Sequence, residues 1–206
     1  MGMLLTLLLL FRAEAGQLTL LQQFLQPVSA FRAEFVQRSL DEQGRLLAED
    51  RGWLVLARPN RFRWQVEAPF AQIVLSDGER LWQVDPELNQ AVVQPLAGQQ
   101  AGGWLWIWTH PDRLEQRFIV QERRDGPGTG QMLLQARPGQ SQGLDSVRLQ
   151  FEAGRPTRIV SEDALGGRVV IELHRLEIDP PLADDLFRYQ PPAGMDVLRQ
   201  HPEPLP

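Results

Sequence analysis

Residues 139–143, GQSQG, place Ser141 in the spacing of a serine-hydrolase nucleophile elbow. That motif requires a strand before the serine and a helix after it, because the sharp turn between them lifts the hydroxyl over an oxyanion hole. Here the residues before Ser141, Arg137-Pro138-Gly139, are typical of a loop, and a strand pattern follows in place of a helix. We therefore interpret this segment as a loop, and a hydrolase that uses Ser141 remains an alternative.

Other residues that could carry chemistry are scarce. His110, His174 and His201 show no metal-ligand spacing, so we expect no metal site and no cofactor. Cysteine is absent from the 206 residues, which excludes a disulfide framework, a thiolate nucleophile and a lipid-modified cysteine. All 21 basic residues are arginine, and without lysine there is no Walker-type phosphate loop and no Schiff-base chemistry. A net charge of -5 does not favour a polyanion as partner. We expect a protein that is not an enzyme.

Strands are the main elements that would position functional side chains. Along residues 52–93, segment after segment alternates apolar and polar residues between short turns, the period-two pattern of a sheet with one apolar face. Phe62, Trp64 and Val66 share one side of such a segment, and Asp77-Gly78 is typical of a hairpin turn. No connection has room for repeated crossover helices, so we expect an antiparallel sheet. Further strand patterns begin at Phe31 and cover residues 132–136, 146–152, 158–161 and 168–178.

Two segments are candidates for short helices that cover the apolar face of this sheet and form a lid. Residues 17–26 have an apolar stripe at helical spacing and are followed by Pro27, which ends the helix. The stripe consists of Leu18, Leu20, Leu21, Phe24 and Leu25.

The second candidate, residues 101–118, contains Trp104, Trp106 and Trp108. A spacing of two fits a buried strand, whereas in a helix Trp104 and Trp108 share a face and Trp106 lies nearly opposite. We favour a short helix, apolar nearly all round and broken near Pro111, because glycines and this proline bracket the segment.

The first fifteen residues are interpreted as a secretory signal. Residues 3–11 are apolar except for Thr6, and Ala13-Glu14-Ala15 fits a small-residue cleavage site. The apolar run is too short to span a bilayer, and the basic residues that normally precede it are missing. The alternative is that these residues form the first turns of the helix that continues into Gln17. Residues 16–206 are then expected to form a single domain.

Four motifs in this order resemble the periplasmic outer-membrane lipoprotein carrier family, LolA. They are residues 58–64, RPNRFRW, residues 76–82, SDGERLW, the pair Asp85-Pro86, and residues 187–197, FRYQPPAGMDV. The resemblance runs from about Gln17 to this last motif. It implies a mainly β fold with some α structure (α+β), namely an incomplete antiparallel β-barrel whose hydrophobic cavity is covered by a helical lid.

The resemblance also implies a role for Arg58. From the residues alone, Arg58 shares a strand face with Leu54 and Leu56, and a strand-end arginine that reaches water is the ordinary interpretation. In the family, the arginine of the matching motif lies inside the barrel and donates hydrogen bonds to lid backbone, which keeps the empty cavity shut. By the same resemblance Phe62 lies near the mouth and Trp64 lines the cavity.

The expected site therefore has three parts. The lid latch is Arg58. The acyl-chain cavity and its mouth are formed by Leu54, Leu56, Phe62, Trp64, Val66 and Trp82. The lid side chains are Leu18, Leu21, Phe24, Leu25, Trp104 and Trp108.

The function that the resemblance implies is that of a monomeric periplasmic chaperone. It would accept acylated lipoproteins from the inner-membrane transporter LolCDE, shield their acyl chains, and deliver them to the outer-membrane receptor LolB. The lack of a cysteine for lipid attachment separates the chain from LolB, which is itself membrane-anchored. An alternative is a related envelope carrier of lipid or glycolipid, or an envelope sensor.

Overall fold

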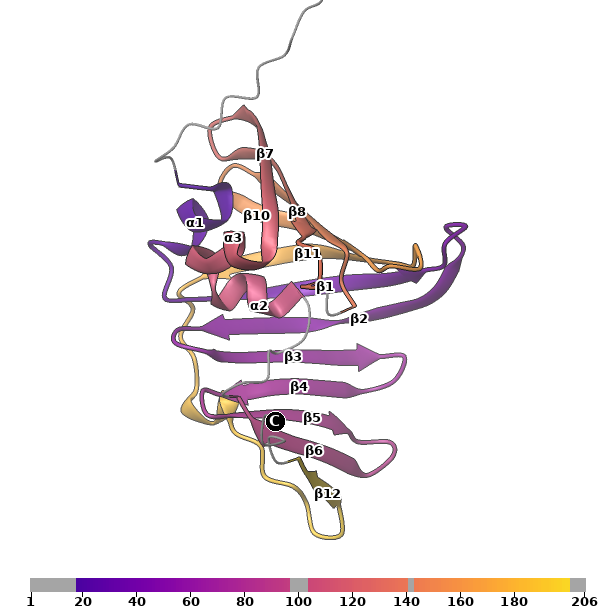
Figure 1. Ribbon diagram of the computed structural model, residues 1–206. Coiled ribbons are helices and arrows are strands. Elements are labelled where there is room, and N and C mark those ends of the chain that lie inside the picture. Colours follow the sequence, from indigo (N-terminus) through magenta and orange to yellow (C-terminus); the bar gives the residue numbers. More distant parts are fainter. Residues whose placement is uncertain (1–17, 97–103, 141–142, 201–206) are drawn as a thin grey trace, which may run out of the picture.

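A computed structural model describes residues 18–96, 104–140 and 143–200. Residues 1–15, Ser141 and His201 lie outside this range, so the expected signal segment and the alternative nucleophile have no structural description. In the described residues one sheet of twelve strands carries three short α-helices and two 3-10 helices (Figure 1). The strands are β1 (Ala30–Leu40), β2 (Leu46–Ala57), β3 (Arg61–Ala68), β4 (Gln72–Asp77), β5 (Arg80–Asp85), β6 (Gln90–Pro95), β7 (Phe118–Gly126), β8 (Thr129–Ala136), β9 (Ser146–Glu152), β10 (Arg155–Glu162), β11 (Arg168–Ile178) and β12 (Asp196–Arg199).

The order of strands across the sheet is β12-β6-β5-β4-β3-β2-β1-β11-β10-β9-β8-β7. From β1 to β6 and from β7 to β11, strands that follow one another in the chain pair as antiparallel neighbours, and β1 pairs with β11 to join the two halves. The edge strands β7 and β12 are not neighbours in this order, so the curled sheet is an incomplete barrel. The expected fold class, mainly β with a few helices over an open sheet, is confirmed.

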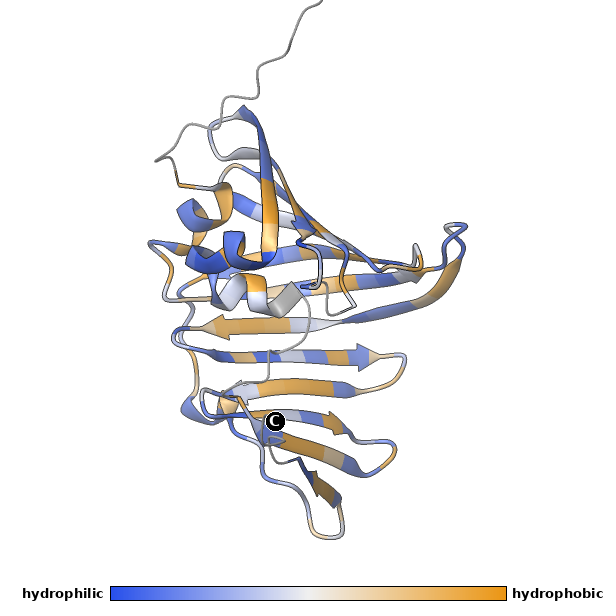
Figure 2. Ribbon diagram, viewed as in Figure 1, coloured by the Kyte–Doolittle hydropathy of each residue, from blue (hydrophilic) through white to orange (hydrophobic). Residues whose placement is uncertain are grey.

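Sequence alternation accounts for the strands. On β3 the buried residues Phe62, Trp64 and Val66, which belong to the cluster on the concave face, alternate with partly exposed ones. Figure 2 shows the apolar and polar residues along the strands of the sheet. The hairpin at Asp77 is confirmed, since its carboxylate oxygen Oδ1 accepts hydrogen bonds from the backbone N–H groups of Glu79 and Arg80 at 2.9 and 2.8 Å.

Two predictions about the sheet need correction. The strand β12 runs parallel to β6, whereas a wholly antiparallel sheet was expected. The chain between β6 and β12, which includes β7–β11 and the segment after β11, supplies the long connection that a parallel pair requires. In addition, residues 118–126 form β7, an edge strand that its largely polar sequence does not reveal.

The lid consists of α1 (Leu20–Leu25), α2 (Trp104–Thr109), the 3-10 helix η1 (Pro111–Arg113) and α3 (Leu114–Arg117), all on the concave face of the sheet. Thr19 and Gln22 form a capping box that starts α1, because the hydroxyl accepts from the Gln22 N–H and the Gln22 side chain accepts from the Thr19 N–H. The expected helix with a break near Pro111 is confirmed. None of the helices in the described part of the chain is long and apolar enough to cross a bilayer.

A second apolar layer covers the opposite, convex face. The 3-10 helix η2 (Asp184–Phe187) packs on β2 through Phe187, and Tyr189 packs on Trp82 with ring centroids 5.5 Å apart. Arg63 donates a hydrogen bond to the Leu186 carbonyl at 3.0 Å and lies over the Trp53 ring, and burial lowers its pKa.

Candidate functional site

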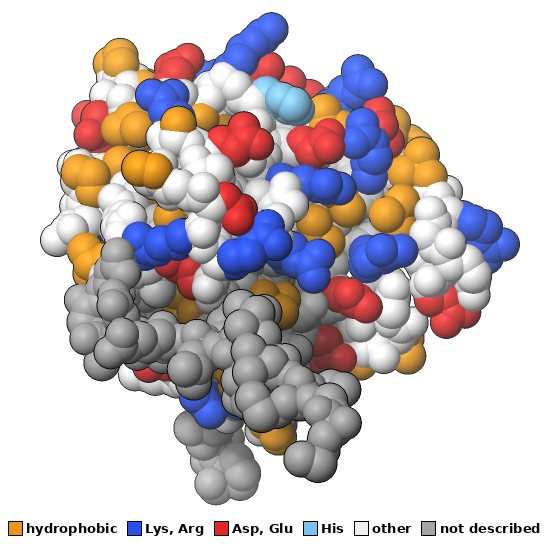
Figure 3. Space-filling model, turned by 90° about the horizontal axis from the view of Figure 1, so that it is seen from above, with side chains coloured by type: hydrophobic (Ala, Val, Ile, Leu, Met, Phe, Trp, Pro, Cys, Tyr) orange, Lys and Arg blue, Asp and Glu red, His pale blue; other side chains and the backbone are white. Residues whose placement is uncertain are grey.

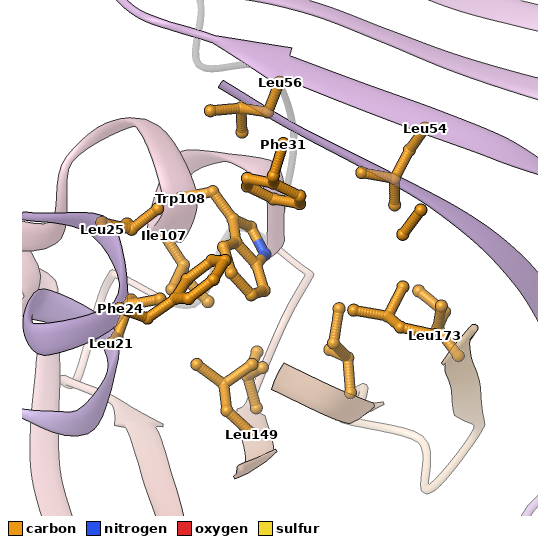
Figure 4. Close-up of a cluster of buried hydrophobic side chains, with 14 of the residues drawn as sticks. Leu21, Phe24, Leu25, Phe31, Leu54, Leu56, Ile107, Trp108, Leu149 and Leu173 are labelled. Atoms are coloured by element: carbon orange, nitrogen blue, oxygen red, sulfur yellow. The ribbon is translucent and has the colours of Figure 1, made fainter. Parts of the chain in front are cut away.

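The concave face encloses an apolar interior that is filled by side chains of the strands and of the lid (Figure 4). Phe24 of α1 and Trp108 of α2 both pack against Phe31 of β1, with ring centroids 5.4 and 5.6 Å from the Phe31 ring. Leu21 and Ile107 are completely buried beside them. One aromatic cluster therefore holds α2 against α1 and β1, which lie far from it in the sequence.

Behind this cluster a small void remains, with a volume of about 10 Å³. That is roughly the space of one water molecule, so no acyl chain fits while the lid side chains are in place. The residues around the void come from both halves of the sheet and from α2. They are Phe31, Leu54, Val55, Leu56, Phe62, Arg63, Trp64, Trp108, Ile159 and Leu173.

A larger cleft of about 440 Å³ lies outside the void, between the lid and the loop that joins β2 to β3. This volume falls within the usual range of small-molecule pockets. Polar side chains line it from both sides, including Gln22 and Asp112 on the lid and Arg58 and Asn60 on the loop. Leu56 and Trp108 line both the cleft and the void, so these two side chains separate the outer cleft, whose lining is mixed polar and apolar, from the apolar void.

Arg58 lies at the rim of this cleft and is exposed. Its guanidinium donates a hydrogen bond to the backbone carbonyl of Leu25, the last residue of α1. Such a carbonyl has no intrahelical partner, and a multi-donor cation suits it. The expectation that the guanidinium lies inside the barrel is wrong, because the chain leaves β2 at Ala57 and carries Arg58 out to the rim.

Other polar contacts hold α1 at its remaining sides. Gln22 donates through Nε2 to the Pro111 carbonyl at 3.3 Å, which joins α1 to the second part of the lid. At the start of α1, the Leu20 N–H donates to a carboxylate oxygen of Glu122 at 2.8 Å, and Arg124 of β7 donates to the Leu18 carbonyl at 2.6 Å. The lid is thus attached to the sheet by a few hydrogen bonds at its rim and by apolar packing beneath.

Of the predicted cavity residues, all except Trp82 lie together on the concave face. Leu54, Leu56, Phe62 and Trp64 surround the void, and Val66 belongs to the same buried cluster. Trp82 pairs with Leu75 in the register of β4 and β5, which turns its side chain to the convex face against Tyr189. The prediction that Trp82 lines the cavity is therefore wrong.

Some of the predicted lid residues are buried and one is exposed. Leu21, Phe24 and Leu25 of α1 and Trp108 of α2 are buried, whereas Leu18 precedes α1 and is 41 % exposed at the cleft. The side chain of Trp104 lies outside the described residues. Sequence reasoning missed Ile159 and Leu173 as parts of the void wall; both belong to apolar strand patterns, but nothing in those patterns indicated which inward residues would meet α2.

The polar groups of the lid do not form a reactive centre in the part of the chain that the structure describes. His110 stacks on Trp106 with ring centroids 5.1 Å apart, and its Nδ1 lies 2.8 Å from the Thr109 hydroxyl. Burial lowers the pKa of His110, and the nearby Arg113 and Arg117 lower it further. Among the described residues no group of His, Asp and Glu side chains has the arrangement of a metal site.

The surface at the end of the molecule that carries α1 and β7 is mixed in charge (Figure 3). Arginine side chains form a row across this face, and acidic side chains lie on both sides of the row. Intervening apolar side chains are also exposed there. This surface does not offer the continuous positive field that a polyanion would need.

Comparison with known proteins gives the family. The family of the outer membrane lipoprotein carrier protein LolA matches residues 26–190. The outer-membrane lipoprotein carrier protein of Halorhodospira halophila is 33 % identical over 199 residues, 96 % of this chain and 92 % of the relative. That of Alkalilimnicola ehrlichii is 35 % identical over 179 residues, 86 % of this chain and 81 % of the relative.

A solved structure supports the fold alone. The crystal structure of an uncharacterized conserved protein from Thermus thermophilus superposes with a TM-score of 0.55 at 17 % identity, covering 88 % of this chain and 95 % of that one. The match over residues 26–190 and the relatives above 30 % identity show that the chain belongs to the LolA family of outer membrane lipoprotein carrier proteins.

Proposed function

We propose that this protein is a monomeric periplasmic chaperone that accepts acylated lipoproteins from the LolCDE transporter and delivers them to LolB. In this role the apolar interior receives the acyl chains, the helices α1 and α2 act as the lid, and Arg58 is the latch. The protein is a carrier and catalyses no reaction. The observation that supports this most is that one apolar interior is occupied by side chains of two short helices, which are tied at their rim by few polar contacts.

The energetics suit reversible loading. A chain of roughly fifteen methylenes gains about 12 kcal/mol by leaving water, at about 0.8 kcal/mol each. To enter, it must displace lid side chains such as Leu21, Phe24 and Ile107, and each buried side chain of this size contributes about 1.5–3 kcal/mol. Displacing about five of them costs on the order of 8–15 kcal/mol. The two amounts are comparable, so cargo is exchanged for lid contacts and can be given up to a better acceptor.

The same comparison explains the need for an energised donor. A bilayer shields a methylene as well as the protein interior does, so moving an acyl chain from membrane to carrier gains little. Lid opening then makes loading unfavourable unless another process drives it. A transporter that uses ATP supplies that drive, and the receptor at the outer membrane removes the cargo.

The test is native mass spectrometry of protein purified from an envelope fraction, combined with release of lipoprotein from LolCDE proteoliposomes in the presence of ATP. We expect bound triacylated protein and ATP-dependent release. Free lipid as the only bound species would contradict the proposal and favour an envelope lipid or glycolipid carrier.

A matched pair of variants locates the binding space. Leu173→Phe adds volume to the wall of the void, and Leu75→Phe adds the same volume to the cluster on the convex face. We expect Leu173→Phe to reduce loading and Leu75→Phe to leave the loading of folded protein unchanged. Equal effects of the two substitutions would show that the concave interior is not the binding space.

A further inference from the structure

Trp108 carries a buried polar group without a partner. Its side chain is 3 % exposed, and within the described residues its indole Nε1 and the Arg158 Nε are the buried side-chain nitrogen or oxygen atoms that make no hydrogen bond. An unsatisfied buried donor costs about 1–3 kcal/mol, and such groups are rare enough in folded proteins to require a reason.

The donor points into the inner space. In Figure 4 the indole nitrogen faces away from Leu25 and toward the side of the interior where Leu54 and Leu173 lie. These two residues and Trp108 line the void. Arg63, which also borders the void, directs its guanidinium to the Leu186 carbonyl on the other face of the sheet.

Water is a poor partner for this N–H. The void of about 10 Å³ is at the lower limit for one water molecule, and a buried water needs two to four polar partners. Apart from Trp108 and Arg63, the residues around the void are apolar. An acceptor for the indole must therefore arrive with whatever enters the interior.

We propose that Trp108 Nε1 donates a hydrogen bond to the acyl carbonyl oxygen of the bound lipid. This inference rests on the proposed function and adds a binding residue to it. Trp108 and Leu56 lie at the boundary between the void, which is apolar, and the cleft, which also carries polar side chains such as Gln22 and Asn60. In a lipid, the carbonyl is the polar group at the boundary between hydrocarbon tail and head group. The tail lies in the inner space, the head lies in the cleft near Gln22 and Asn60, and the carbonyl reaches the indole.

The test compares lipids that differ in this carbonyl. The ester 1-palmitoylglycerol and the ether 1-O-hexadecylglycerol have the same tail and head, and N-palmitoylethanolamine presents an amide carbonyl instead. Their Kd values are measured for the whole chain, for Trp108→Phe, and for Trp106→Phe as control, since Trp106 is a buried lid tryptophan that does not line the void. In two-dimensional NMR spectra, the indole N–H signal of Trp108 is identified as the one missing from Trp108→Phe.

We expect the unmodified chain to favour the ester or the amide over the ether about fivefold more strongly than Trp108→Phe does, about 1 kcal/mol. Trp106→Phe should keep the preference of the unmodified chain. The proton signal of the Trp108 indole should move downfield with a carbonyl lipid and not with the ether.

Two outcomes would overturn the inference, and they are distinguishable. All three lipids could bind with the same ratio of Kd values in the unmodified chain and in Trp108→Phe. In that case Trp108 does not donate to the carbonyl, and the proposed carrier function is not affected. If none of the lipids binds the unmodified chain or moves any signal of the interior, the inference and the proposed carrier function both fail.

Discussion

Arg58→Leu isolates the contact between the β2–β3 loop and the lid. The guanidinium donates to the Leu25 carbonyl at the end of α1, and this contact exists only while α1 lies over the interior. Leucine removes every donor and leaves the strands β2 and β3 unchanged. The substitution should therefore affect the closed, empty state and not the loaded one.

The expected magnitude follows from the exposure of the site. A hydrogen bond of this kind, at an exposed rim, contributes about 1 kcal/mol to the closed state. Losing it raises the small fraction of open molecules about fivefold. Because the apparent Kd of a ligand scales inversely with the fraction of binding-competent protein, Arg58→Leu should bind an acyl lipid about fivefold more tightly. The empty protein should at the same time melt about 2–4 °C lower.

The assay is titration with a fluorescent palmitoyl lipid, together with thermal unfolding of the empty protein. Arg80→Leu, which replaces an exposed arginine on β5, is the control and should change neither value. Tighter binding with lower melting temperature distinguishes loss of a latch from general destabilisation, which would weaken binding. An unchanged Kd for Arg58→Leu would refute the latch role.

Three further predictions concern the scaffold. Gly52→Ala should lower the free energy of unfolding by about 1–3 kcal/mol in urea titrations, because a Cβ there would lie 1.9 Å from the Gln65 carbonyl oxygen and the strand would have to shift. Trp82→Ala should lower the free energy of unfolding by about 3–5 kcal/mol, because it removes the contacts with Tyr189 and the rest of the convex-face cluster. The folded protein should still bind acyl lipid with unchanged Kd. A large change in Kd would place Trp82 in the binding site. Burial lowers the pKa of His110 from its ordinary value of 6.5, so this histidine is protonated in the unfolded chain at a higher pH than in the folded protein. The free energy of unfolding should therefore decrease as the pH falls below about 6.5. In melting curves between pH 5 and 7.5, the melting temperature of His110→Gln should depend less on pH than that of the unmodified chain.

The sequence predicts which side chains of a strand point into the interior only where the strand has a single apolar face. The alternation of Phe62, Trp64 and Val66 assigns β3 correctly, since only its inner face is apolar. On β5, Leu81 and Trp82 are adjacent and both buried, so alternation alone does not say which one faces inward. Trp82 faces outward because the segment after β11 covers the convex face of the sheet. The apolar residues of that proline-rich segment follow neither the helical nor the strand period, so its position could not be predicted.

The lid shows a similar limit. The sequence predicts a short helix that is apolar nearly all round, and the structure buries Trp106, Ile107 and Trp108 in succession. Helical periodicity does not indicate which of these three consecutive apolar side chains points toward the interior, because all three are apolar and all three are buried. That Trp108 meets Phe31 and Phe24 follows from the packing of α2 against α1 and β1, which are far from α2 in the chain.

The central claim is that cargo replaces the lid side chains within the concave interior. Because the chain contains no cysteine, spin labels can be attached only where cysteines are introduced. Exposed positions suit this purpose, with Gln23 on α1 and Gln116 on α3 each paired with Glu79 in the β4–β5 turn. Pulsed electron paramagnetic resonance then measures the two label distances with and without a triacylated lipopeptide. We expect at least one distance to lengthen as the lipopeptide binds. Stoichiometric binding with both distances unchanged would show that cargo does not displace the lid.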